Sequence, residues 1–199
     1  LPCWLLIRRA RYLAAVGRTA EAEAGYELAL RAEDCGPQER AAVTAHSAEL
    51  LLQLGRYTQA GRGATVALDL ADGVGAGEMV STIVLASAAL GFSQAYLNDP
   101  VAGLHTLQQA LRTAKRSGSP GDVACAYLHL AELLTGPLNE LEEGIAVARR
   151  GAAHAEQLGI GRTYGTRLLA VAANGLFRIG RWSEAEKTIA AALRYRPAG

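Results

Sequence analysis

Cys125 and His129 are the residues whose types and spacing come nearest to a catalytic pair. They stand four positions apart, which places them one turn apart on a helix. A thiol beside an imidazole can act as an activated nucleophile, but such a dyad also needs an orienting group and a pocket. The sequence indicates neither, so we interpret the pair as a packing contact and expect no catalytic residue. An enzyme that uses this pair stays as the third functional hypothesis.

No other polar residues have the spacing of a metal or phosphate site. The histidines (His46, His105, His129 and His154) form no HExxH pattern, and the three cysteines form no CxxC pair. The glycine-rich stretch at residues 73–77 follows an expected helix rather than a strand, and it lacks the Lys-Ser/Thr of a phosphate loop. The sequence therefore predicts no metal and no cofactor, and it predicts an ordinary loop at residues 73–77.

Composition and charge exclude several classes of protein. The 199 residues include 40 Ala and 29 Leu, while Val and Ile together number 16. Ala and Leu favour helices and β-branched residues favour strands, so we expect an all-α fold. The 20 basic and 19 acidic residues give a net charge of +1. A chain this balanced has no strong general attraction to nucleic acid or anionic lipid, so we expect no direct nucleic-acid binding by this segment.

The remaining compositional features concern location. Three scattered cysteines are typical of reduced thiols in a cytoplasmic protein. Residues 79–98 carry no formal charge and are long enough to span a bilayer, but they include six Ser, Thr, Gln and Asn side chains. We therefore interpret them as a buried helix and expect no membrane contact. Because the chain starts with Leu1, we expect it to be a fragment of a larger protein.

An internal repeat organises the whole chain. Four residues mark the expected turns, namely Gly17, Gly55, Asn98 and Gly180. After each of them, a small residue follows at the fifth position, an Ala at the twelfth and a Leu at the thirteenth. Another small residue stands twelve positions before each of those small residues. We expect these pairs to be packing anchors between antiparallel helices, since only small residues permit close approach. The pairs are Ala10 and Ala22, Ala48 and Ala60, Gly91 and Gly103, and Ala173 and Ala185.

The repeat and its Gly and Pro breakers predict ten helices. They are expected at residues 3–16, 19–34, 38–54, 57–71, 77–97, 100–117, 120–135, 139–158, 162–179 and 182–195. Pairing them gives five repeats in one array over residues 1–199. The expected repeats are 3–36, 37–74, 75–118, 119–159 and 160–199.

The pattern resembles the tetratricopeptide repeat (TPR). Its Ala-x3-Phe…Pro signature is matched best by Ala185, Ile189, Ala192 and Pro197. The spacing between successive small anchors is 38 to 43 residues, longer than the 34 of the standard repeat. The resemblance implies a right-handed α-solenoid of about five TPR-like repeats, whose concave face is lined by the first helix of each pair.

The last forty residues suggest a narrower resemblance. Gly159 to Gly165, Leu168, Asn174, Phe177 and the run from Gly180 to Trp182 look like the helical-repeat region of large bacterial LuxR-type regulators. In that family an ATPase module precedes the repeats and a helix-turn-helix follows them. The resemblance implies a sensor module without enzymatic activity, whose parent protein contacts ATP and DNA through other parts.

The concave face is where we expect a partner to bind. The expected residues combine Arg at both ends with aromatic and apolar side chains between; they are Arg11, His46, Glu49, Phe92, Tyr96, Tyr127, Arg167 and Asn174. The expected partner is a protein, a peptide or a small inducer. An equal alternative is that Phe92 and Tyr96 pack against neighbouring helices and contact no partner. The alternatives are a stand-alone peptide-binding adaptor or scaffold, and a homodimer that forms through exposed apolar ends.

Overall fold

The computed structural model describes residues 1–75 and 77–195. These residues form ten α-helices and one π-helical turn, and no strand occurs among them. The elements are α1 (Cys3–Ala15), α2 (Thr19–Leu30), α3 (Pro37–Gln53), α4 (Tyr57–Val74), α5 (Val80–Tyr96), α6 (Pro100–Ser117), α7 (Pro120–Thr135), α8 (Leu141–Gln157), η1 (Gly161–Gly165), α9 (Thr166–Arg178) and α10 (Trp182–Arg194). The ten predicted helices are confirmed, while Pro197 and Ala76 lie outside the described residues.

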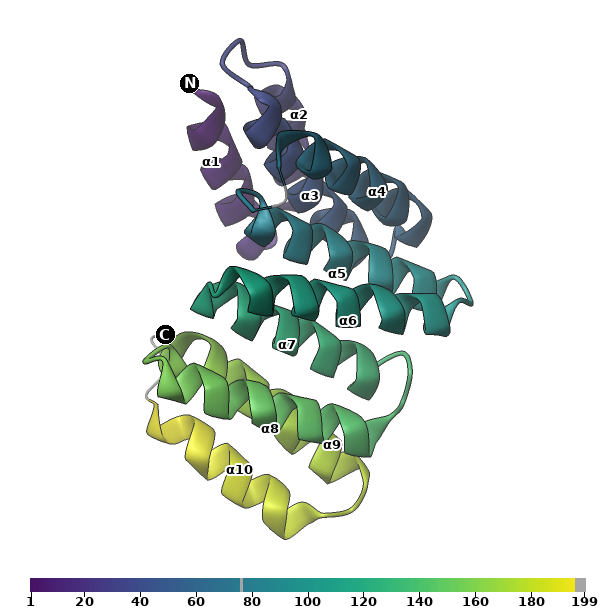
Figure 1. Cartoon of the computed structure of the whole chain (residues 1–199), viewed down its shortest axis with the longest axis vertical. Helices are drawn as coiled ribbons and strands as arrows, with labels where there is room; N and C mark the ends of the chain where they lie inside the picture. The colour runs from purple at the N-terminus through teal and green to yellow at the C-terminus, as the bar shows by residue number, and fades with distance from the viewer. Residues whose placement is uncertain (76, 196–199) are drawn as a thin grey trace. The chain divides into compact units, whose positions relative to one another are not determined.

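The chain divides into two compact units, Leu1–Asp99 and Pro100–Gly199. The first contains α1 to α5 and the second contains α6 to α10. Within each unit, consecutive helices pack side by side (Figure 1), and the first helices of neighbouring pairs also contact each other, as α3 contacts α5 and α7 contacts α9. The sequence predicts a single array over residues 1–199. That prediction depends on how the two units join, and it stays a prediction.

The turns inside the helix pairs share one backbone conformation. Gly17, Gly55 and Gly180 have φ angles of +80°, +72° and +80°, and Asn98 occupies the same place in the repeat with φ of 74°. The N–H of the next residue reaches back five positions, as when Arg56 N donates to Leu51 O at 2.9 Å. This hydrogen bond closes the helix end in a Schellman motif, which needs the left-handed conformation that Gly and Asn tolerate.

Methyl groups form most of the core between α3, α4 and α5. Three layers recur along these helices, and each layer takes one residue from α3, one from α4 and one from α5 or, for Met79, from the residue directly before α5. The layers are Ala41, Ala71 and Met79; Ala45, Ala67 and Ala86; and Ala48, Ala64 and Ala89. As the position advances along α3 it recedes along α4, so these two helices are antiparallel. Small side chains let the helix axes approach closely at each layer.

The expected anchor alanines of the first unit are buried, and glycines of the second helices also lie close to two of them. A Cβ placed on Gly25 would lie 3.0 Å from the Cβ of Ala10, and one on Gly63 would lie 3.4 Å from that of Ala48. These glycines come one turn after the expected partners, Ala22 and Ala60. Two antiparallel helices rise equally from their turn, so residues nearly equidistant from it face each other. The expected pairs were seven and five residues from the turn glycine. The contacts within the expected pairs stay predictions.

The other two anchor pairs lie elsewhere in the array. Ala173 and Ala185 are both buried in the second unit, and Gly91 and Gly103 are buried in different units. The contact expected between Gly91 and Gly103 therefore stays a prediction.

Larger side chains fill the second unit. Leu128, Leu133 and Leu134 of α7 are fully buried, together with Leu168 and Leu176 of α9. Gly151 of α8 lies directly against α7, because a Cβ there would be 2.7 Å from the Cβ of Tyr127. The backbone of α8 thus packs onto α7 at a glycine, as α2 does onto α1 at Gly25.

The uncharged stretch at residues 79–98 contains the whole of α5. Nearly half of this helix is buried, including Ser87 and Ser93, and Ser93 Oγ donates to Ala89 O at 2.6 Å. No helix within the described ranges is long and apolar enough to cross a bilayer.

Candidate partner-binding site

The first-helix face of the first unit carries a hollow of about 200 Å³, which we call the first hollow. Arg11 of α1 and His46 and Glu49 of α3, three of the residues expected to contact a partner, line it. Tyr26 of α2 and Gln53 of α3 complete its polar wall. Three residues that the sequence separates by up to 38 positions therefore converge on one surface.

His46 is the most constrained side chain of the first hollow. Its ring stacks on Tyr26, with centroids 6.4 Å apart and planes 8° from parallel. Its Nδ1 atom is buried without a hydrogen bond, and the nearby Glu49 Oε2 lies 3.6 Å away, beyond normal hydrogen-bond length. Burial raises the pKa of Tyr26 to about 12, and the Glu49 carboxylate adds to the shift. The hollow therefore holds a neutral phenol and an imidazole nitrogen that can accept or donate one more hydrogen bond.

The second unit carries a comparable hollow of about 330 Å³ between α7 and α9, which we call the second hollow. Arg167 and Asn174 of α9, two more of the residues expected to contact a partner, line it. Glu132 and Thr135 of α7 form the opposite side. Each hollow thus combines a guanidinium, a carboxylate and a side-chain amide, the last supplied by Gln53 or Asn174.

A row of polar side chains leads along α7 to the second hollow. The Sγ atom of Cys125 lies 3.3 Å from Nε2 of His129, so the two residues touch. On its other side, His129 Nδ1 lies 3.6 Å from Oε2 of Glu132. Glu132 is thus shared between this row and the second hollow.

The aromatic residues expected on the concave face differ in how far they are exposed to solvent. Tyr96 is 46% exposed and stacks on Tyr57, with ring centroids 4.3 Å apart, while Phe92 is partly buried. Tyr127 is only 9% exposed, and Lys115 lies over its ring at 5.0 Å. Tyr127 therefore belongs to the core of the second unit, which differs from the expectation that it would offer its ring to a partner.

Sequence reasoning missed Glu132, the residue that connects the α7 row to the second hollow. The spacing that could have identified it is His-x-x-Glu, which occurs at His46 and Glu49 and again at His129 and Glu132. On a helix this spacing places the two side chains on one face. Tyr26, Gln53 and Thr135 carry no comparable signal, because only the tertiary fold brings them to the hollows.

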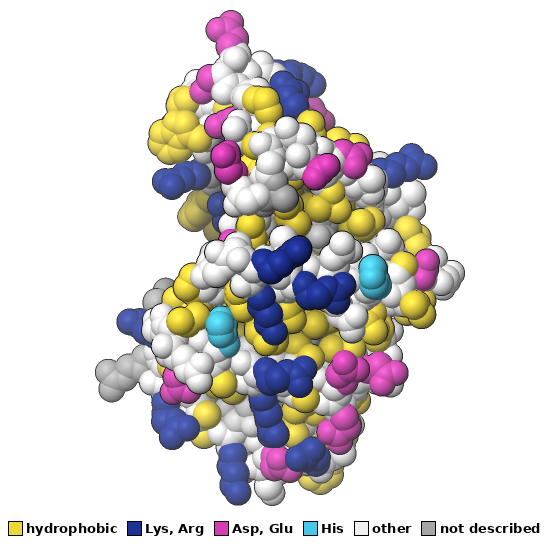
Figure 2. All heavy atoms as spheres, viewed as in Figure 1, with side chains coloured by type: hydrophobic (Ala, Val, Ile, Leu, Met, Phe, Trp, Pro, Cys, Tyr) yellow, Lys and Arg dark blue, Asp and Glu magenta, His cyan; other side chains and the backbone are white. Residues whose placement is uncertain are grey.

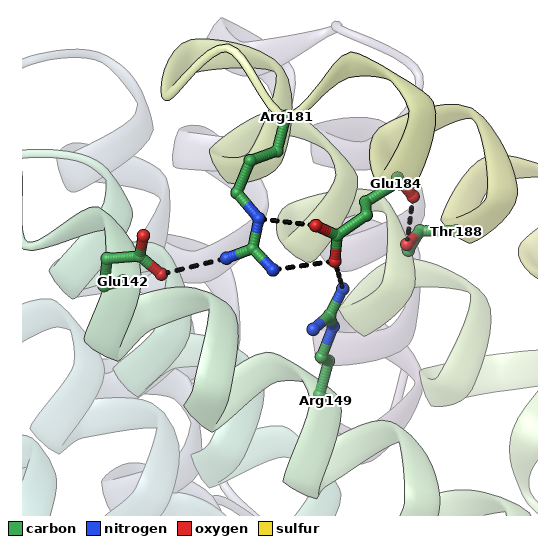
Figure 3. A network of polar contacts seen from close by, with 5 residues as sticks. All are labelled: Glu142, Arg149, Arg181, Glu184 and Thr188. Atoms are coloured by element: carbon green, nitrogen blue, oxygen red, sulfur yellow. Dashed lines mark hydrogen bonds and ion pairs between the residues drawn. The ribbon is translucent and has the colours of Figure 1, made fainter.

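An ion-pair network joins α8 to α10 at the far end of the second unit (Figure 3). Arg181, which directly precedes α10, pairs with Glu184 of α10 and with Glu142 Oε2 of α8 at 3.3 Å. Arg149 of α8 reaches Glu184 Oε2 at 3.4 Å. Interactions with these guanidinium groups lower the pKa of Glu184, the hydrogen bond from Arg181 contributing most. This network lies on the second helices, and we assign it to stability rather than to binding.

The net charge of the whole chain is close to zero, but the two units differ in net charge. Residues 1–99 contain eight Lys and Arg against eleven Asp and Glu, whereas residues 100–199 contain twelve against eight. Figure 2 shows Lys and Arg side chains gathered over α6 and α8. The exposed cations on these helices are Arg112, Lys115, Arg116, Arg149 and Arg150.

The site offers no metal centre within the part of the chain that the structure describes. Nowhere in those residues do three or more His, Cys, Asp or Glu side chains come together as metal ligands would.

No protein-family model matches this chain, and no curated protein matches it in sequence. Solved structures do resemble it. A Rap protein complexed with competence and sporulation factor aligns with a TM-score of 0.82 at 15% identity, over 97% of this chain and 53% of its own. A STAND ATPase with a tetratricopeptide repeat sensor from Pyrococcus horikoshii aligns with a TM-score of 0.72 at 14% identity, over 97% of this chain and 29% of its own.

A thermophilic TPR protein from Thermus thermophilus aligns with a TM-score of 0.68 at 21% identity, over 98% of this chain and 92% of its own. The chain thus spans about half the length of the Rap protein and under a third of the ATPase. At these identities the likeness concerns the fold. The prediction of an all-α, TPR-like solenoid is confirmed.

Proposed function

We propose that this chain is a non-enzymatic interaction and sensor module that binds a peptide segment of a partner protein on its first-helix faces. The observation that carries the proposal is the convergence of Arg11, His46 and Glu49 in one hollow and of Arg167 and Asn174 in another. Two of the similar structures support it, since one is a Rap protein complexed with a factor and the other contains a TPR sensor.

The side chains of the hollows suit an extended peptide. An Arg guanidinium binds carboxylates through two parallel hydrogen bonds, and this fits acidic side chains or a C-terminus. The amides of Gln53 and Asn174 can pair with the N–H and C=O groups that an extended backbone leaves unpaired. A small inducer with a carboxylate could use the same groups, and we keep it as a second ligand class.

The wider role that we propose is regulation of transcription within a LuxR-type regulator. In this proposal, occupancy of the first-helix faces would be passed to neighbouring modules through a change in curvature, so the ligand must prefer one curvature. The alternative is a stand-alone TPR adaptor or scaffold. The full-length gene product distinguishes the two, because a regulator requires a GxxxxGK[ST] loop before this segment and a helix-turn-helix after it.

The binding proposal can be tested with an array of twelve-residue peptides, in which each acidic peptide is matched by a copy with Gln and Asn in place of Glu and Asp. We expect the acidic copies to bind better, and we expect Arg11→Ala or Arg167→Ala to weaken their binding about tenfold or more, measured by fluorescence anisotropy. Arg31→Ala is the matched control, because Arg31 lies exposed at the end of α2 and pairs with Glu27.

Equal binding by wild type and both hollow variants would place the ligand elsewhere on the molecule. Binding of no peptide in the array would count against the peptide class as a whole.

A further inference from the structure

Cys125, His129 and Glu132 form a connected row whose chemistry the proposed function does not use. Four and then three positions separate them on α7, so one face of the helix presents all three. Sγ lies 3.3 Å from His129 Nε2, and His129 Nδ1 lies 3.6 Å from Glu132 Oε2. Sulfur, imidazole and carboxylate thus stand in the order of a nucleophile, its base and the group that orients the base.

The surroundings favour a charged imidazole between two partners. The side chain of His129 is only 14% exposed, while Glu132 is more open and Cys125 is partly exposed. Burial opposes the imidazolium, but the contacts with Cys125 and Glu132 outweigh it and raise the pKa of His129 to about 10. An imidazolium beside Sγ stabilises the negative charge that develops on the sulfur when it acts as a nucleophile.

We propose that Cys125 is a nucleophilic thiol and a site of covalent modification by small carbon electrophiles, with His129 and Glu132 as its positioning residues. Sγ bonds to the electrophilic carbon while the leaving group departs with the electron pair of its own bond. The thiol proton is released to solvent as the carbon–sulfur bond forms, because the imidazolium of His129 already carries a proton on each ring nitrogen. Glu132 stabilises the imidazolium during this step.

The chain supplies its own reference thiols. Cys3 and Cys35 are both buried in the core of the first unit. Burial raises the pKa of Cys3 to about 12, so this thiol stays protonated at neutral pH. Selective reaction at Cys125 can therefore be measured within one molecule.

The probe is iodoacetamide, which forms a carbon–sulfur bond and releases iodide. The full chain is labelled at pH 7, and each cysteine-containing peptide is quantified by mass spectrometry over time. We expect Cys125 to react at least tenfold faster than Cys3 and Cys35, and faster than free glutathione under the same conditions. Labelling in urea should bring the three cysteines to similar rates.

Two variants test the positioning roles. His129→Gln should slow labelling of Cys125 about tenfold or more, and Glu132→Gln should slow it by a smaller factor. The rate between pH 6 and pH 9 should rise steeply in His129→Gln, as for an ordinary thiol, and less in the wild type. The matched control is His46→Gln, which removes the other His-x-x-Glu pair at the same 3.6 Å separation but has no cysteine beside it.

Circular dichroism and the labelling of Cys3 and Cys35 report whether each variant is folded. The Glu132 variant still tests the proposal if His129→Gln does not fold. Either of two results overturns the proposal. One is labelling of Cys125 that is no faster than that of glutathione. The other is a labelling rate in folded His129→Gln or Glu132→Gln that equals or exceeds the wild-type rate.

Discussion

Arg181 donates two hydrogen bonds to the carboxylate of Glu184, from Nε at 2.6 Å and from Nη2 at 2.7 Å. Arg18 makes the same paired contact with Glu21, at 2.6 and 2.5 Å. Both pairs follow a left-handed glycine and open the second helix of a repeat. The Gly-Arg-x-x-Glu segment is therefore a structural unit, in which the Glu of the first helical turn holds the Arg that precedes the helix.

The two pairs should differ in their effect on stability. Arg181 also reaches Glu142 of α8, whereas the ion pair of Arg18 among the described residues is with Glu21 of its own segment. We expect Arg181→Met to lower the thermal midpoint slightly and Arg18→Met to lower it less, because both sites are exposed to solvent. In 1 M NaCl the difference should vanish. Midpoints that differ as much in high salt as in low salt would contradict an electrostatic origin.

Gly151 should tolerate no larger residue. A Cβ at this position would lie 2.7 Å from Tyr127 Cβ and 3.0 Å from Leu168 Cδ2, so either α8 or its neighbours must move. We expect Gly151→Ala to reduce the free energy of unfolding by about 1–3 kcal/mol, measured by urea denaturation. Gly73→Ala is the control, because Gly73 lies in α4 with no heavy atom within 4 Å of its added Cβ. That variant should gain about 0.5–1 kcal/mol from helix propensity.

The turn at Gly55 should depend on backbone conformation rather than on space. Its φ is +72°, and nothing lies within 4 Å of an added Cβ. We expect Gly55→Ala to cost about 1–2 kcal/mol, because a Cβ disfavours the left-handed region. Gly55→Asn should cost less, since Asn98 holds the corresponding turn at φ 74°. Equal losses for the two variants, again by urea denaturation, would point to a cause other than φ.

His129 should make folding stability depend on pH. Its pKa rises from 6.5 to about 10 on folding: burial lowers the pKa, but the contacts with Cys125 and Glu132 raise it more. A raised pKa means that the folded state binds the proton more tightly, so this contribution is complete below about pH 6.5 and is lost as pH approaches 10. Urea midpoints at pH 6, 8 and 10 should therefore fall more steeply in wild type than in His129→Gln. Parallel curves would show that His129 titrates alike in both states.

The helices were predictable because the repeat marks their ends. Residues 100–117 and 120–135 match α6 and α7 at both ends, since Pro starts each helix and the same small residues recur inside it. The π-helical turn at Gly161–Gly165 was not predictable. It lies against a residue distant in sequence, as a Cβ on Gly161 would be 2.7 Å from the ring of Tyr195.

The candidate site was predictable in part, for a related reason. Helical spacing put Arg11, His46, Glu49, Arg167 and Asn174 on the first helices, and each lies in a hollow there. Spacing could not reveal that Lys115 and Gly151 enclose Tyr127, because those contacts come from the helices on either side of α7. The His-x-x-Glu spacing indicates that Glu132 shares a helix face with His129, but it does not give the separation of their side chains, which depends on rotamers.

The three methyl layers between α3, α4 and α5 give the first unit an unusual mechanical property. Alanine has no side-chain rotamers, so these layers cannot absorb an added atom by turning a side chain aside. Any larger residue at Ala45, Ala67 or Ala86 must act as a wedge that separates three helices together. The bend of the unit therefore depends on the size of the side chains in these layers. Single methylene groups are the smallest steps by which a substitution could change that bend.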